Sequence, residues 1–104
     1  MTTLAFKYTT ESELINFNFT PVLLTGETIS SAAVSVTVRT GTDASPSAIL
    51  SGSASISAGY VVQRVYNGTD NVTYRITCTA TTSSSNIYTL TADLPVYSPT
   101  NSGV

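Results

Sequence analysis

The strongest constraint on the fold is an alternation in the stretch Asn71–Thr82, which is NVTYRITCTATT. From Val72 onwards every second residue is apolar or small, and the residues between them are threonines and one arginine. Because successive side chains of a β-strand point to opposite faces, this pattern predicts a strand with one buried and one exposed face. Cys78, the only cysteine of the chain, lies on the apolar face with Tyr74 and Ile76. We therefore interpret Cys78 as a small core residue, since a reactive thiol needs a basic neighbour and access to solvent.

Shorter stretches of the same alternation run along the rest of the chain. Apolar residues share one face in the segment 14–20, and three valines do so in the segment 34–38. Ile29 is out of phase with these valines, and a bulge near residues 30–32 would restore the parity. We expect strands over residues 5–8, 14–20, 29–38, 72–82 and 87–97, one from Ile49 or Leu50 to Ile56, and one from Val61 or Val62 to Val65. About seven short strands with turn signals between them predict one all-β domain folded as a β-sandwich, with a β-barrel as the alternative.

The low charge of the chain excludes several classes of partner. Only 10% of the 104 residues are charged, against about 25% in an average domain, and serine and threonine supply 34 residues. The basic residues are scattered singly, whereas a nucleic-acid partner needs a clustered positive face. No signal peptide is visible, and no apolar stretch approaches the roughly 20 residues that span a bilayer. We therefore expect no nucleic-acid partner, no membrane and no intramolecular disulfide.

The residues of common catalytic and metal sites are missing. The chain has no histidine, which excludes Ser-His-Asp and Cys-His catalysis and the commonest metal ligand. One cysteine is too few for a structural zinc site, and the acidic residues lie far apart in sequence. The loop Asn67–Asn71 offers oxygen ligands for calcium but a single carboxylate, which favours a hairpin turn. We predict no catalytic residue, no cofactor and no metal.

Three pieces of the sequence carry a family resemblance. They are Phe17-Asn18-Phe19-Thr20, Gly26-Glu27-Thr28-Ile29, and the stretch Tyr74–Ser83, which is YRITCTATTS. In this order they resemble a group of short bacteriophage virion proteins, and the resemblance covers roughly residues 9–97. Such proteins look like single immunoglobulin-like sandwiches and are structural parts of tailed phage particles. The resemblance implies an immunoglobulin-like β-sandwich of about seven strands and carries over no catalytic residue.

The same resemblance implies a function. We expect a non-enzymatic virion structural protein, made in the host cytoplasm, that docks on the tail or neck and connects fibres to the particle. Its partners would be other phage structural proteins (tail or neck adaptors, portal-proximal proteins, tail fibres or the capsid), bound in multiple copies. One alternative is a capsid decoration protein. Another is a carbohydrate- or receptor-binding module, for which six tyrosines could supply a surface, although the chain has no tryptophan.

The contact surfaces are predicted from the chain's flanks and its edge strands. We expect a single domain over residues 1–97, with an extended N-terminal segment over residues 1–12 and a flexible C-terminal tail over residues 98–104. Edge strands of a sandwich are available for strand addition by a partner. The predicted interface residues are Phe6, Tyr8, Glu11, Glu13, Arg39, Arg64 and Tyr97.

Overall fold

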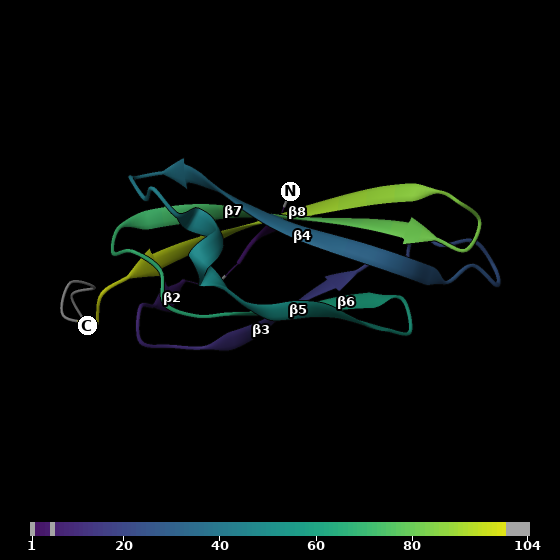
Figure 1. The fold of residues 1–104 in the computed structure, drawn as a ribbon, viewed down its shortest axis with the longest axis horizontal. Coiled ribbons are helices and arrows are strands. Elements are labelled where there is room, and N and C mark those ends of the chain that lie inside the picture. The colour runs from purple at the N-terminus through teal and green to yellow at the C-terminus, as the bar shows by residue number, and fades with distance from the viewer. Residues whose placement is uncertain (1, 5, 100–104) are drawn as a thin grey trace.

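The computed structural model describes residues 2–4 and 6–99, which form two packed β-sheets (Figure 1). Sheet A contains β1 (Thr2–Thr3), β2 (Lys7–Tyr8), β4 (Ile29–Thr40), β7 (Val72–Thr82) and β8 (Ile87–Tyr97). Sheet B contains β3 (Glu13–Asn18), β5 (Leu50–Ser57) and β6 (Tyr60–Val65), and a 3-10 turn, η1 (Pro46–Ile49), precedes β5. The described chain is therefore the all-β sandwich that the alternation predicts, and the barrel alternative is wrong.

Six strands have the order found in an immunoglobulin sandwich, whereas the first strand lies in the other sheet. Sheet B has the order β3-β6-β5, and sheet A has the order β8-β7-β4 with β1 and β2 along the outer edge of β8. An immunoglobulin sandwich pairs its second, fifth and fourth strands in one sheet and its seventh, sixth and third in the other, as here. If β1 and β2 are counted as one interrupted strand, the sandwich has seven strands. This first strand pairs in parallel with β8 in sheet A.

The alternation of β7 builds the centre of the core. Its side chains are buried at every second position from Val72 to Thr82, and Tyr74, Ile76 and Cys78 are completely buried. The side chains between them face outward from sheet A and are partly exposed. Sheet B contributes fully or almost fully buried residues from the facing side, among them Phe17 and Val61. The predicted position of Cys78 on the packed face of a strand is confirmed.

The long strand β4 needs a bulge, as its sequence predicts. The register between β4 and β7 shifts between Ile29 and Ser31, which turns Ile29 onto the same inward face as Val34 and Val36. A second shift, between Val38 and Thr40, was not expected from the sequence. The next strand was predicted to begin at Ile49 or Leu50, and β5 begins at Leu50 because Pro46 starts a 3-10 turn that ends at Ile49.

The N-terminal segment lies along the edge of sheet A. β1 pairs with β8 at Thr2 and Ala92, and β2 pairs with it at Lys7 and Val96. Most of the predicted C-terminal tail, residues 100–104, lies outside the described residues. Ser98, at its start, donates its backbone N–H to Asp70 Oδ1 at 2.7 Å. Within the described ranges, no helix has the length and apolar character needed to cross a bilayer.

Candidate protein interfaces

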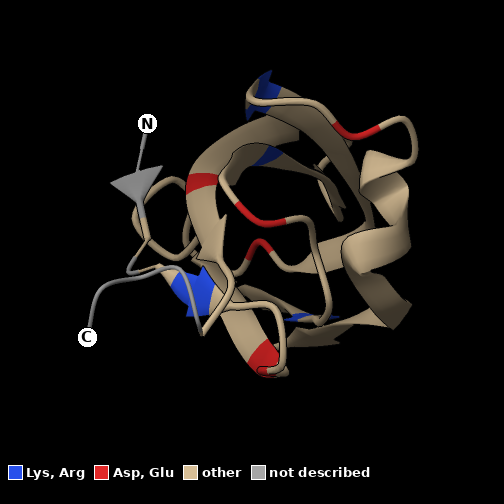
Figure 2. Cartoon of the chain, turned by 90° about the vertical axis from the view of Figure 1, so that its left-hand side faces the viewer, with Lys and Arg blue, Asp and Glu red and all other residues tan. Residues whose placement is uncertain are grey.

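Charged side chains gather at one end of the sandwich. The chain has four basic and six acidic side chains. Nine of these ten lie in residues 7–13, 39–46, 64–75 and 93–99, which meet where β8 ends and β3 begins; we call this the charged end (Figure 2). The opposite end comprises residues 19–29, 56–60 and 82–87, and we call it the neutral end. Its one charged side chain is Glu27.

At the charged end, Asp93 is the buried centre of an ionic cluster on the outer face of sheet A. Its carboxylate accepts hydrogen bonds from Arg39 on β4 and from Arg75 on β7, the latter at 3.2 Å from Nε. Asp93 is only 1% exposed. Burial by itself raises the pKa of Asp93, but the hydrogen bonds and charges of Arg75 and Arg39 outweigh it and lower that pKa below its ordinary value. The cluster ties three strands of the sheet together.

Three aromatic side chains also meet at the charged end, where β2 runs beside β8. The Phe6 ring centroid lies 5.3 Å from that of Tyr8 and 5.7 Å from that of Tyr97, and both contacts are edge-to-face. Glu11 fixes the following turn, because its Oε1 accepts the Tyr8 N–H at 2.8 Å and its own N–H donates to the Tyr8 carbonyl at 3.0 Å. Phe6 is 48% exposed. The cluster therefore presents an aromatic surface to solvent.

Hydrogen bonds of two buried side chains, Lys7 and Tyr74, stabilise the interior of the charged end. Lys7 is buried, and its Nζ donates to the carbonyl oxygens of Tyr8, at 2.8 Å, and of Asn67. Desolvation lowers the pKa of Lys7, although the negative charges of Glu13 and Glu11 oppose the shift. Tyr74 donates its hydroxyl to Asp43 Oδ2 at 2.6 Å and accepts the Thr69 N–H at 2.8 Å. The hydrogen bond from the Tyr74 hydroxyl lowers the pKa of Asp43, while burial raises the pKa of Tyr74.

The neutral end is held together by Glu27, which follows a turn at Gly26 (φ +80°). Its carboxylate accepts hydrogen bonds from the Leu24 N–H at 2.9 Å, from the Thr82 hydroxyl, and from the Asn86 side-chain amide at 2.9 Å. The hydrogen bonds from Leu24, Thr82 and Asn86 lower the pKa of Glu27, although burial opposes them. All three donors are neutral. The carboxylate thus joins the β3–β4 loop to the β7–β8 turn without a cation.

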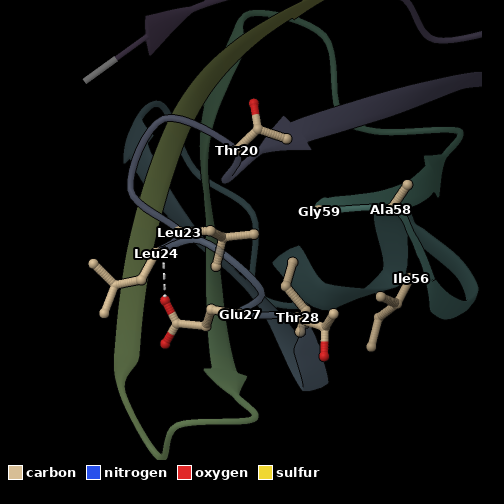
Figure 3. A pocket seen from close by; sticks show the side chains of 9 residues that line it. Thr20, Leu23, Leu24, Glu27, Thr28, Ile56, Ala58 and Gly59 are labelled. Carbon is tan, nitrogen blue, oxygen red and sulfur yellow. Dashed lines mark hydrogen bonds between the residues drawn. The ribbon is translucent and has the colours of Figure 1, made fainter.

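An open groove lined by apolar side chains, two threonines and Glu27 lies between the edges of the two sheets (Figure 3). Its volume is about 430 Å³. It is lined by Thr20, Leu23, Leu24, Glu27, Thr28, Ile29, Ile56, Ala58 and Gly59. Ile56 pairs across the β5–β6 ladder with Val61, which is completely buried, so both side chains face the interior. Ile56 is nevertheless 41% exposed, which shows that the core is open at this point.

Comparison with protein-family models matches residues 7–95 to the family described as podophage GP4 fiber-tail adaptor protein gp77. The chain belongs to this family. The resemblance to phage virion structural proteins is therefore confirmed, and the family description supports a structural role as a tail adaptor. Neither the comparison with curated proteins nor that with solved structures finds a significant match. The matched span includes the whole neutral end, whereas Phe6 and Tyr97 lie just outside it.

The predicted interface residues of this family member all lie at the charged end, but they do not form one patch. Phe6, Tyr8 and Tyr97 are in contact, with Glu11 beside them. The others are separate: Glu13 and Arg64 lie on sheet B, where Arg64 Nη1 donates to Ser12 Oγ at 3.1 Å, and Arg39 is paired with Asp93 near the opposite edge of sheet A. Their role as an interface remains a prediction.

The groove at the neutral end was missed by the sequence analysis. A signal for it exists, because residues 14–26, 28–38, 44–63 and 76–92 contain no charged side chain. Only the topology shows that parts of these four segments meet at the neutral end of the molecule. No group of three or more potential metal ligands occurs among the described residues. Burial raises the pKa of the Cys78 thiol to about 11, so the thiol stays protonated near neutral pH.

Proposed function

We propose that this protein is a non-enzymatic adaptor that docks on the tail or neck of a phage particle and connects fibres to it. The family match over residues 7–95 is the observation that carries the proposal. An adaptor acts by binding rather than by chemistry, and binding requires a rigid scaffold with exposed loops and edges. The charged and neutral ends supply such surfaces at opposite ends of the strands.

The chemical difference between the two ends supports this role. An adaptor must bind two partners at once, and two surfaces at opposite ends of a sandwich do not compete for the same partner. The charged end offers two separate features, the aromatic cluster of Phe6, Tyr8 and Tyr97 and the ionic cluster of Asp93. The neutral end offers apolar side chains, of which Leu24 and Ile87 are among the most exposed. Binding in several copies would add weak individual contacts together.

Quantitative mass spectrometry of purified particles tests the proposal. We expect the protein in the virion at roughly a dozen copies, as fits a closed ring around a tail or neck. Hundreds of copies would identify a capsid decoration protein instead. Absence from the particle would overturn the proposal. Specific binding of the isolated domain to a glycan array, without incorporation into particles, would favour the carbohydrate- or receptor-binding alternative.

A further inference from the structure

We infer that two copies of this protein join through the free edge of β4, where residues 31–35 pair antiparallel with the same residues of the second copy across a twofold axis at Ala33. The inference goes beyond the proposed function, because it concerns the contact between copies and not the contacts with fibre or tail. Three observations carry it: an unpaired strand edge, half-buried apolar side chains on that side of the sandwich, and charged residues of opposite sign at the two ends of the edge.

The first observation is the free edge of β4 in the half nearer the neutral end. Among the described strands, β4 pairs with β7 alone, and its residues 31–38 keep regular register between the two bulges. Proteins protect such edges with charged residues, proline or a covering element. The stretch Ile29–Val38 has no charged residue and no proline, and the 3-10 turn η1 lies against the part of β4 nearer the charged end (Figure 1). The other half is therefore open to a further strand.

The second observation is that inward-facing side chains on this side of the sandwich are incompletely buried. Ala32 and Val34 pair across the β4–β7 ladder with Ala80 and Cys78, which are completely buried, yet both stay partly exposed. β5 is the edge strand of sheet B on the same side, and its Ile56 is 41% exposed. A single added strand would cover Ala32 and Val34 alone, whereas a second two-layered sandwich also covers Ile56. This observation favours a folded copy over an isolated segment.

The third observation is that charged residues of opposite sign flank the free edge, each six positions from Ala33. Glu27 precedes β4, and the three donors that hold its carboxylate are neutral. Arg39 lies near the other end of β4 and shares the carboxylate of Asp93 with Arg75, so that cluster keeps one net positive charge. In an antiparallel pair centred on Ala33, the end that bears Arg39 lies beside the end of the other copy that bears Glu27. A parallel pair would bring like charges together instead.

The antiparallel contact also suits the parts of the edges that are already covered. Because the two β4 strands run in opposite directions, the two η1 turns lie beyond opposite ends of the paired residues 31–35. The outer edge of β8 is less suitable as the partner of β4, although no described strand pairs with it before Ala92. There β1 pairs with Ala92 and Asp93 and would obstruct a strand as long as β4. A twofold contact uses the same surface in both copies and closes at two.

Thiol crosslinking of the purified protein tests the contact. Ala33→Cys should give a covalent dimer with a short bismaleimide, because the two cysteines would lie on the twofold axis. Thr79→Cys is the control, since Thr79 pairs with Ala33 on the same face but the two copies of β7 would be three strand spacings apart, about 14 Å. It should give at least tenfold less dimer, and Cys78 is buried. Equal yields from the two variants, or no dimer from Ala33→Cys, would overturn the inference.

A matched pair of double variants tests the antiparallel register. Ser31 and Ser35 are exposed on the outer face of β4, and each would lie opposite the other across the axis. Replacing both by lysine places like charges opposite each other twice, so the Kd of the dimer should rise about tenfold or more. Ser31→Glu with Ser35→Lys places opposite charges there and should restore the native Kd. Thermal unfolding checks folding, sedimentation equilibrium measures Kd, and equal Kd values for the two double variants would contradict this register.

Hydrogen exchange identifies the strand that forms the contact. Backbone amides of residues 31–35 should exchange more slowly at protein concentrations where dimers form than where the protein is monomeric. Amides of β3 should not change, because β3 is the edge strand of sheet B on the opposite side of the sandwich. Slower exchange in β3 and not in β4 would overturn the inference. If the protein is absent from particles, the proposed function fails, whereas these measurements on the purified protein still decide the dimer.

Discussion

The two buried carboxylates Asp93 and Glu27 differ in what balances their charge. Asp93, at the charged end, lies between two arginines on neighbouring strands. Glu27, at the neutral end, accepts hydrogen bonds from a backbone N–H, a hydroxyl and a side-chain amide. Both pKa values are lowered, but by different interactions. Hydrogen bonds from positively charged arginines stabilise the Asp93 carboxylate, and hydrogen bonds from neutral donors stabilise that of Glu27.

The difference shows how one small sandwich can carry two unlike surfaces. Arginine side chains at the charged end neutralise Asp93 and remain partly exposed, so they stay available to a polar partner. At the neutral end, hydrogen bonds fix the loop geometry without adding a cation to the surface. The one carboxylate near the exposed apolar side chains, that of Glu27, is buried and already accepts three hydrogen bonds. Each end is thus suited to a different kind of contact.

The largest expected effect comes from Asp93→Asn. The substitution keeps the shape of the side chain but leaves Arg39 and Arg75 without their carboxylate. We expect a loss of about 1–2 kcal/mol in the free energy of unfolding, at the low end for a charged hydrogen-bonded group because both arginines are partly exposed. Urea denaturation measures it. The loss should shrink in 1 M salt, where the screening length is about 3 Å; a loss independent of salt would contradict an ionic role.

Glu27→Gln should have a smaller effect that depends on pH and not on salt. The folded-state pKa of Glu27 is lowered, so its contribution to stability is complete above the unfolded pKa of about 4.5 and is lost as pH falls through the folded value. In the native protein, NMR signals of the Asn86 side-chain amide should therefore shift below about pH 4.5. The shift should be absent in Glu27→Gln and present in Asp93→Asn. The same shift in all three proteins would show that Glu27 does not hold this turn.

Cys78 lies in the core between the two ends, and its substitution tests whether the residue acts only in packing. Cys78→Ala should lower the free energy of unfolding by about 1 kcal/mol or a little more, because it leaves a small cavity in a packed site. Cys78→Val should alter it by a similar amount or less. Assembly into particles should be unchanged for both. Loss of assembly by a folded Cys78→Ala protein would mean that the residue acts in more than packing.

Three features were predictable: the alternation of β7, the sandwich and the β4 bulge. Each depends on the two-residue alternation of side chains along a strand, which local sequence shows directly. The groove was not predictable, because it is built from the β3–β4 loop, the start of β4 and the end of β5, and only tertiary packing brings Leu24, Ile29 and Ile56 together. The partners of Asp93 were hidden for the same reason, since Arg39 is 54 residues away in sequence. The contact of Phe6 with Tyr97 likewise depends on the pairing of β2 with β8.

The smallest effect on stability is expected from Phe6→Ala at the charged end. Phe6 is half exposed, so losing its two edge-to-face contacts should lower the free energy of unfolding by about 0.5 kcal/mol or less. If the aromatic cluster is the surface that docks on the particle, incorporation into virions should fall far more than this loss of stability explains. Tyr66→Ala is the control, because Tyr66 is also exposed at the charged end but belongs to the loop after β6. Equal incorporation of the two variants would remove the aromatic cluster from the docking surface.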